Sequence, residues 1–251
     1  MSITLKKEFF SPLINKKLPK PKGQLSGHNA GEPFCEEAFL FLKEKDREKV
    51  FKQYQFLNLL YEKNKNAKTV DERKKLLDPT IGLMINRGIE SIKKWDLNKF
   101  DEKQNDTADI IYLEKKKFNI IDVKTANLGK KGQQPNIISA VKLANICKSL
   151  IINKDYQNLE IFYLGIYWKL DEQFLIIKNL DLINLFKIPP KDLYINWAAA
   201  TQIQFHIHEV KQDFMSSKIE WAEQYLRTFI SSGNERIKKM AELLDQFSKF
   251  I

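Results

Sequence analysis

The sequence predicts an α/β protein, in which apolar strands alternate along the chain with amphipathic helices. Two β-rich runs, residues 108–113 and 118–125, flank a short charged stretch, which is typical of a hairpin. Residues 159–168 and 173–178 have the apolar composition of two further strands, which we also expect to pair as a hairpin. Apolar residues at helical spacing predict helices before, between and after these strands.

The chain has 251 residues, of which 43% are hydrophobic, so it can form one large domain or two small ones. We expect a single domain over residues 1–251, with a basic N-terminal arm at about 1–31 and C-terminal helices at about 217–251. The net charge of +10 favours a polyanionic partner, either nucleic acid or an acidic membrane. A basic but inert surface has the same composition.

Two cysteines, Cys35 and Cys147, lie inside apolar helical patterns, so buried reduced thiols are expected rather than a disulfide scaffold or a zinc site. The N-terminus lacks the apolar core of a signal peptide, and no stretch approaches the ~20 apolar residues of a membrane span. We therefore expect a soluble, cytoplasmic protein that does not bind membranes.

The first third of the chain is predicted to be helical. Pro33 suits the first turn of a helix that runs to about Glu44 and carries Glu36 and Glu37. Either glutamate could approach a metal site, although outward-facing, solvated glutamates are more common. A second helix follows over about 50–61, then a polar loop over about 64–75, and a third helix from Asp78 to Trp95.

The hairpin at 108–125 has a register that gathers charged groups. If Lys115 and Lys116 form the turn, Leu113 faces Phe118 and Asp109 faces Asp122. Lys124, two residues beyond Asp122, points to the same side of the sheet. A shift of one residue would separate these groups.

Two neighbouring carboxylates in a partly buried place are unfavourable unless a proton or a cation lies between them. Magnesium is commonly held by one or two carboxylates, phosphate oxygens and water. Lys124 could then stabilise the charged transition state or help to deprotonate an attacking water. The pattern suggests metal-dependent phosphodiester hydrolysis, whereas the alternative interpretation is a surface ion pair of little energetic value.

Residues 127–135 are predicted to form a loop beside this hairpin. Its glycines, Lys130, Lys131, Gln133 and Gln134 suit close approach to DNA, because lysines bind phosphates and amides can read bases. An ordinary flexible loop is the alternative. Asn136 is then expected to cap a helix that extends to Leu150.

The last part of the chain carries fewer chemical signals. A short helix is expected over 181–186, and a half-exposed strand over 202–208 places His206 and His208 on one face beside Glu209. No third metal ligand is evident, so a polar face toward solvent or DNA is the better interpretation. Two helices, 219–230 and 237–247, are expected around an interruption at Gly233 and Asn234.

Several stretches along nearly the whole chain resemble the HincII family of type II restriction endonucleases, within the PD-(D/E)xK nuclease superfamily. They are LSGHNAGEPF at 25–34, FKQY at 51–54, EKQNDTADI at 102–110, DVKT at 122–125, PNIISA at 135–140, LYINWAAA at 193–200 and QIQFH at 202–206. The resemblance implies a restriction-endonuclease-like fold, with a mixed β-sheet flanked by helices. It also implies a homodimer that cuts both strands of double-stranded DNA at a short palindrome, GTYRAC-like, to leave blunt ends.

The resemblance also implies roles for individual residues. Asp109, Asp122 and the Val123 carbonyl would hold Mg2+, and Lys124 would act on the attacking water. The resemblance further assigns Gln133 to wedging into the base stack, Asn136 and Asn196 to reading the grooves, and Tyr194 to a place near the DNA backbone. A cognate DNA methyltransferase is expected in the same system, but not as a stable partner.

Two residues, Ala126 and Gln134, depart from the family's pattern close to the expected DNA and leave the recognised sequence open, above all at its central base pairs. Two rival functions stay open at this point. One is a repair or recombination nuclease that reads DNA structure. The other is a DNA-binding module without catalysis, which would show only tight, salt-sensitive binding.

Overall fold

A computed structural model describes residues 5–23, 25, 27–64, 69, 72, 107–114, 117–130, 135–198, 201–248 and 250. The chain divides into two compact units, each with its own β-sheet. The first unit comprises Met1–Gly132 and Asn158–Leu185, and the second comprises Gln133–Gln157 and Phe186–Ile251. Whether these units behave as one domain, as expected from the sequence, stays a prediction.

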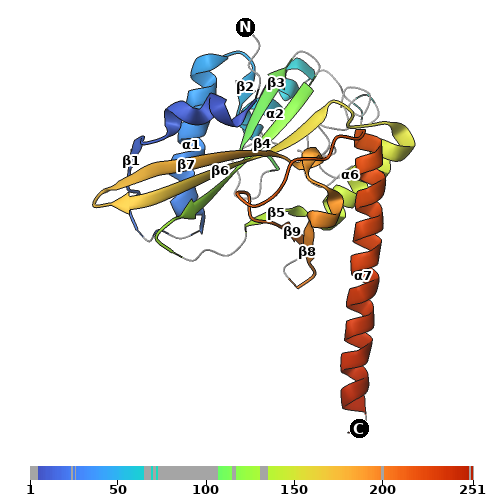
Figure 1. Ribbon diagram of the computed structural model, residues 1–251. Coiled ribbons are helices and arrows are strands. Elements are labelled where there is room, and N and C mark those ends of the chain that lie inside the picture. Colours follow the sequence, from blue (N-terminus) through green and yellow to red (C-terminus); the bar gives the residue numbers. More distant parts are fainter. Residues whose placement is uncertain are drawn as a thin grey trace. The chain divides into compact units, whose positions relative to one another are not determined.

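The first unit is built on a 6-stranded mixed sheet, in the order β1-β7-β6-β4-β3-β2 (Figure 1). Its strands are β1 (Lys17–Pro19), β2 (Val50–Phe51), β3 (Ile110–Glu114), β4 (Lys117–Asn127), β6 (Leu159–Asp171) and β7 (Phe174–Asn184). The β4–β6 pair is parallel and the other pairs are antiparallel. The predicted α/β class and the two predicted hairpins, β3–β4 and β6–β7, are therefore confirmed.

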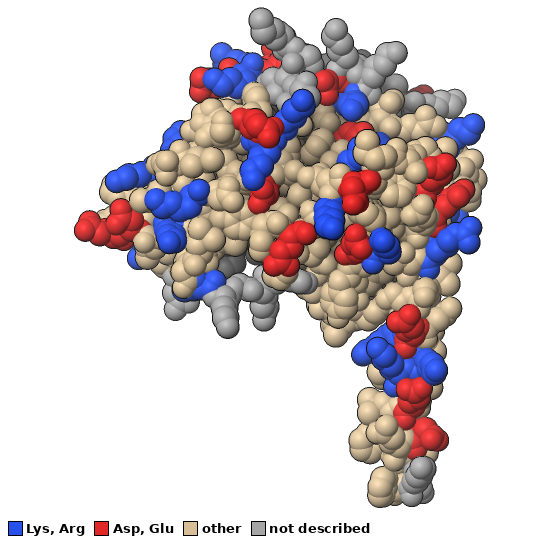
Figure 2. All heavy atoms as spheres, viewed as in Figure 1, with Lys and Arg blue, Asp and Glu red and all other residues tan. Residues whose placement is uncertain are grey.

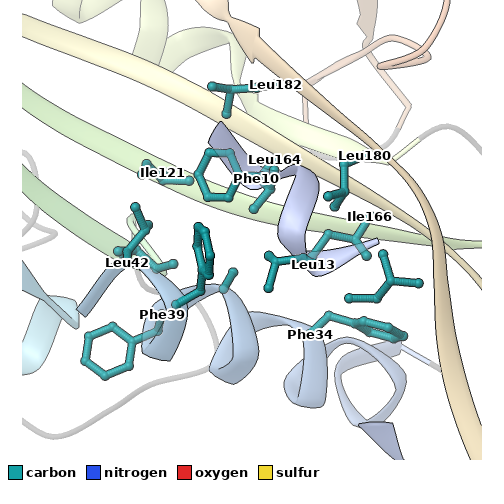
Figure 3. Packing of buried hydrophobic residues seen from close by; sticks show 14 of the residues in the cluster. Phe10, Leu13, Phe34, Phe39, Leu42, Ile121, Leu164, Ile166, Leu180 and Leu182 are labelled. Carbon is teal, nitrogen blue, oxygen red and sulfur yellow. The ribbon is translucent and has the colours of Figure 1, made fainter. Parts of the chain in front are cut away.

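Helices pack on this sheet. They are the 3-10 helix η1 (Lys7–Leu13), α1 (Gly27–Lys45) and α2 (Gln53–Asn64). Figure 3 shows Phe34, Phe39 and Leu42 of α1 and Phe10 of η1 meeting aliphatic side chains of the central strands, among them Ile121. Burial of these apolar faces is the main source of stability for the unit, at roughly 25 cal/mol per Å² of apolar surface.

The second unit contains a 3-stranded antiparallel sheet in the order β5-β9-β8. Its elements are β5 (Asn136–Ser139), α6 (Ala140–Asn153), the 3-10 helix η4 (Pro190–Asp192), β8 (Tyr194–Asn196), β9 (Gln202–Gln204) and α7 (Lys218–Ser248). A further 3-10 helix, η3 (Leu185–Lys187), begins at the last residue of the first unit. The Tyr225 hydroxyl of α7 donates to the Ala140 carbonyl at 2.8 Å, and the Trp221 indole N–H donates to the Ile188 carbonyl at 2.6 Å.

Some predictions in the first unit were wrong. Val50 and Phe51 form β2 against β3 rather than starting a helix, because a β-branched and an aromatic residue suit a sheet edge. The first helix begins at Gly27, so Pro33 lies inside α1 rather than in its first turn. The expected helix from Asp78 to Trp95 and almost all of the expected 64–75 loop lie outside the described residues.

Three predictions in the second half were also wrong. Asn136 belongs to strand β5, and the N-cap of α6 is Ser139, whose hydroxyl accepts the Lys142 N–H at 3.3 Å. Residues 181–184 continue strand β7, so only a 3-10 turn remains of the expected short helix. The expected strand over 202–208 ends at Gln204, although Ile203, Phe205 and Ile207 are buried as the alternation predicted.

The two predicted C-terminal helices are one continuous helix, α7, which passes through Gly233 without a break. The glycine has another purpose, because a Cβ atom there would lie 3.3 Å from Cη2 of Trp197. The Trp197 indole N–H donates to the Ser232 hydroxyl next to it at 2.8 Å. Gly233 therefore makes room for an aromatic ring.

Charges of both signs are interspersed on the face of the molecule in Figure 2. The net charge of +10 is consequently not gathered into one basic patch on the described surface of that face. Within the described part of the chain, no helix has both the length and the apolar character needed to cross a membrane.

Candidate active site

The β3–β4 hairpin has the register expected from its sequence. Leu113 pairs with Phe118 and Ile110 pairs with Ile121, which places Asp109, one residue before β3, opposite Asp122. Strand β4 is central, with β3 on one side and β6 on the other. Both neighbours hold it by hydrogen bonds, so its side chains are placed on a rigid element.

Asp109 and three consecutive residues of β4, Asp122 to Lys124, come together through short contacts. The Val123 N–H donates to Oδ2 of Asp109 at 2.7 Å, which ties the residue before β3 to the middle of β4. The Lys124 ammonium donates to Oδ2 of Asp122 at 2.8 Å. The Asp109 carboxylate is also near enough to Asp122 to add to the rise in its pKa. The structure thus joins the three charged residues singled out in the sequence.

The site is partly buried, and this changes its charge. The Asp122 side chain is 19% exposed and the Lys124 side chain is 25% exposed. Burial raises the pKa of Asp122 to about 7, the Lys124 ammonium opposes this rise, and the Asp109 carboxylate adds to it. A pair of neighbouring carboxylates that ionises with difficulty is a place where a bound cation is favourable.

Lys124 keeps its proton. Burial by itself would lower the pKa of Lys124, but the nearby carboxylates, Asp122 first, outweigh burial and raise it. Lys124 is therefore an ammonium group at neutral pH. Cys35 on α1 is close enough to contribute to the same rise in the pKa of Lys124.

The floor of the site is formed by strand β6. Asp122 is paired in parallel register with Tyr163, which is 1% exposed. Burial and then the Asp122 charge raise the pKa of Tyr163 well above its ordinary value, so its hydroxyl stays neutral. A large neutral ring below the carboxylates keeps water away from that side.

Gln53 at the start of α2 is a residue that sequence reasoning did not single out. Its side chain is 3% exposed, and its Oε1 accepts the Ala108 N–H at 3.0 Å. Ala108 directly precedes Asp109, so this bond holds the chain where it enters the site. The only available signal was a glutamine inside the FKQY stretch, which does not by itself reveal a partner 55 residues away.

The acidic residues of α1 do not join the two aspartates. Glu36 pairs with Lys52 at 2.7 Å, and Glu37 pairs with Lys16. Among the described residues, no group of three or more His, Cys, Asp or Glu side chains is placed to hold a metal. Two carboxylates still match the usual protein share of a magnesium site, in which phosphate oxygens and water complete the coordination.

His206 and His208 also belong to no such group within the part of the chain that the structure describes. Their rings are 5.5 Å apart, and His208 Nε2 lies 3.1 Å from Oε1 of Glu209. His206 lines a surface pocket of about 520 Å³ in the second unit, together with Tyr194 and Gln204. A polar face toward solvent or DNA stays a prediction for these two residues.

The residues expected to bind DNA, from loop composition or from the family resemblance, are spread over both units. Lys130 is exposed in a turn after β4, where its N–H donates to the Asn127 carbonyl at 3.1 Å. Asn136, Tyr194 and Asn196 lie on the three-stranded sheet of the second unit. Lys131 and Gln133 lie outside the described residues.

Comparison with known proteins identifies the family. The sequence model described as "Restriction endonuclease HincII" matches residues 9–251. The type II restriction enzyme HindII of Haemophilus influenzae strain Rd is 42% identical over 245 residues, which cover 96% of this chain and 95% of that protein. The type II restriction enzyme HincII of Haemophilus influenzae is also 42% identical over 245 residues, with the same coverage.

Among solved structures, the NlaIV restriction endonuclease aligns with 63% of this chain and 76% of its own, at 14% sequence identity and a TM-score of 0.28. A likeness at that level carries no weight for function, whereas the two sequence relatives span almost the full chain. The chain belongs to the HincII family of type II restriction endonucleases, which are site-specific deoxyribonucleases.

Proposed function

We propose that this protein hydrolyses phosphodiester bonds of double-stranded DNA at a short palindrome, with Asp109, Asp122 and Lys124 as its catalytic residues and Mg2+ as its cofactor. The observation that carries the proposal is that Lys124 contacts Asp122 at one end of the β3–β4 hairpin, where the Val123 N–H binds the Asp109 carboxylate. An ammonium group beside paired carboxylates suits the attack of water on a phosphate.

In the proposed reaction, a water oxygen forms a bond to phosphorus and the water gives up a proton to solvent. The bond from phosphorus to the leaving oxygen breaks, and that oxygen takes up a proton. Lys124, which is protonated, donates hydrogen bonds to the charge that develops on the phosphate oxygens. The Val123 N–H holds Asp109 in place from β4. Tyr163 below Asp122 keeps that side dry, which strengthens the charged interactions.

Asp109, Asp122 and the Val123 carbonyl are the proposed magnesium ligands. When bound, Mg2+ lowers the pKa of water and neutralises phosphate charge. The fit rests on the raised pKa of Asp122, which burial and the nearby Asp109 carboxylate keep from ionising readily. A divalent cation would stabilise both carboxylates in the charged form.

The remaining proposed roles concern DNA recognition. We assign phosphate contacts to Lys130 and Lys131, wedging into the base stack to Gln133, and groove contacts to Asn136 and Asn196. Tyr194, 60% exposed on β8, would lie near the DNA backbone. The proposed target is GTYRAC-like with blunt ends, although Ala126 and Gln134 differ from the family near the central base pairs.

A homodimer suits this function, because two copies related by a two-fold axis can cut both strands of a palindrome. From position 230 onward, α7 carries an exposed apolar stripe: Ile230, Ile237, Met240, Leu243, Leu244 and Phe247. Apolar residues recur every seven positions at Ile230, Ile237 and Leu244. A second series, Met240 and Phe247, follows Ile237 and Leu244 by three positions. This spacing is typical of a seam between two helices.

The other side of α7 is charged, and Lys238 lies 4.0 Å from Glu242 there (Figure 2). We propose that a second copy of this chain covers the stripe with its own α7. The test compares the molecular mass in solution of two variants. Leu244→Glu adds a negative charge to the stripe, and the control Gln246→Glu adds the same charge to the polar side of α7. Only Leu244→Glu should yield monomers, whereas a monomeric wild-type protein would contradict the homodimer.

The test of the function is digestion of genomic DNA by the purified protein with Mg2+, followed by sequencing of the new ends. Discrete fragments that share one palindrome are expected from the wild type and none from Asp122→Asn. A smear or cuts restricted to junctions would support a repair or recombination nuclease instead. Salt-sensitive binding without any cleavage would support a non-catalytic module.

A restriction enzyme also implies protection of its host. We propose that the protein acts in the cytoplasm and that a cognate DNA methyltransferase modifies the same sequence without forming a stable complex with it. Methylated fragments that resist cleavage, and a nuclease that purifies without the methyltransferase, are the expected observations.

A further inference from the structure

Three amide side chains are joined by hydrogen bonds across the three-stranded sheet of the second unit. Asn196 Nδ2 on β8 donates to Gln204 Oε1 on β9 at 3.0 Å. Gln204 Nε2 donates in turn to Asn136 Oδ1 on β5 at 2.7 Å. We call Asn196, Gln204 and Asn136 the amide row. Gln204 lies in its centre because β9 is the middle strand.

The amide row occupies one face of this sheet. The opposite face carries Ile137, Ile195 and Ile203, which are all buried. Because side chains alternate along a strand, the buried isoleucines force the neighbouring amides to the other side. The sheet therefore presents a hydrogen-bonding face, and part of that face is open to solvent.

The amide row has a defined direction, because an amide has an oxygen that accepts and a nitrogen that donates. Asn196 Oδ1 accepts the backbone N–H of Ala198 at 3.1 Å, which leaves Asn196 Nδ2 for Gln204. Gln204 then accepts at Oε1 and donates from Nε2, so Asn136 is held through its oxygen. Asn136 is thereby oriented to offer the two hydrogens of its Nδ2 group.

We propose that Gln204 determines specificity as a positioning residue, by holding Asn136 with its donors turned toward acceptor atoms on DNA base edges. The inference rests on the proposed function, which assigns Asn136 and Asn196 to the grooves. Base edges differ in their pattern of donors and acceptors, so an amide that cannot turn over discriminates between them, and a freely turning amide does not. The ligand class is an acceptor-bearing base edge, such as purine N7 or O6.

The decisive substitution is Gln204→Glu. A carboxylate only accepts hydrogen bonds, so it can still accept from Asn196 but cannot donate to Asn136 Oδ1. Asn136 would then turn its Nδ2 group toward the carboxylate and its oxygen toward the DNA. We expect cleavage of the wild-type target to fall about tenfold or more relative to targets with single base changes, with a changed order of preference.

Gln202→Glu is the matched control. It adds the same charge on the same strand and the same face, two residues away. Among the hydrogen bonds of the described residues, none joins the Gln202 side chain to Asn136 or Asn196. It should weaken DNA binding to a similar extent for every sequence, in a salt-dependent manner, because phosphate repulsion does not read bases. Gln204→Met, which keeps the length without hydrogen bonds, should reduce discrimination without changing the order of preference.

The measurement is the cleavage rate on the target and on its single-base variants, for each protein whose thermal unfolding matches the wild type. If Gln204→Glu and Gln204→Met keep the wild-type order and ratios, as Gln202→Glu should, Gln204 does not determine specificity. That result would leave the proposed function untouched, because the function is judged by whether Asp122→Asn loses cleavage. If Gln204→Glu fails to fold, Gln204→Met decides the question.

Discussion

Asp122→Asn should make the metal-free protein more stable at alkaline pH. Burial raises the pKa of Asp122 from 3.8 to about 7, with an opposing effect of Lys124 and a further rise from Asp109. The folded protein therefore holds a proton that the unfolded chain releases above pH 3.8. Stability from this group is fully present below that pH and is lost as the pH rises through about 7.

The size of the effect follows from the shift in the pKa of Asp122. At about 1.4 kcal/mol per unit, ionising Asp122 costs the folded protein at most on the order of 4 kcal/mol at pH 8. Asparagine resembles the protonated acid, so Asp122→Asn should match the wild type near pH 4 and exceed it at pH 8. The carboxylate penalty is absent from the variant at every pH.

The assay is urea unfolding with EDTA at several values between pH 4 and pH 8, which gives the free energy of unfolding. Glu223→Gln removes an exposed carboxylate of α7 and serves as the control, which should follow the wild-type profile. Added Mg2+ should stabilise the wild type more at pH 8 than at pH 6, because protons compete with the cation for the aspartates. A wild-type profile that stays level, or an Asp122→Asn profile that falls in parallel with it, would refute this reasoning.

Three other substitutions test separate parts of the structure. Lys124→Ala should lower the rate of DNA cleavage about 100-fold or more while DNA binding in calcium stays close to wild type, since it removes the ammonium beside the phosphate. Gln53→Leu leaves the buried Ala108 N–H without its acceptor, so we expect a loss of about 1–3 kcal/mol in urea unfolding and slower cleavage; unchanged stability would show that the bond is unimportant. Gly233→Leu must displace the Trp197 ring, whose Cη2 would lie 3.3 Å from the new Cβ, and should cost about 1–3 kcal/mol, whereas a neutral result would show that α7 shifts freely.

The local register of the β3–β4 hairpin was predictable, because strand side chains alternate and the expected two-residue turn leaves few pairings. Leu113 and Phe118 pair as expected, and the charged groups of Asp122 and Lys124 meet on one side. The errors lie where a distant contact overrides a local preference. Gly233 appeared to interrupt a helix because glycine is a poor helix former, but the Trp197 ring requires that space.

Distant hydrogen bonds were also beyond the sequence. Asn136 has the composition of a helix cap, yet it joins a strand because Gln204, 68 residues away, is its partner. Gln53 supports Ala108 across 55 residues. Hydrophobic spacing reports which face of a helix or strand is buried, so it could not indicate either of these contacts between distant residues.

By itself, the sequence determined the α/β class, the pairing of both hairpins and the meeting of two aspartates with a lysine. These features depend on neighbours along the chain and on the alternation of side chains in a strand. Only the tertiary structure decided how strongly Asp122 is kept from ionising, that Gln53 supports the entry to the site, and that Gln204 links two asparagines. Burial and hydrogen bonds between distant segments exist only once the chain has folded, because they depend on which surfaces exclude water from one another.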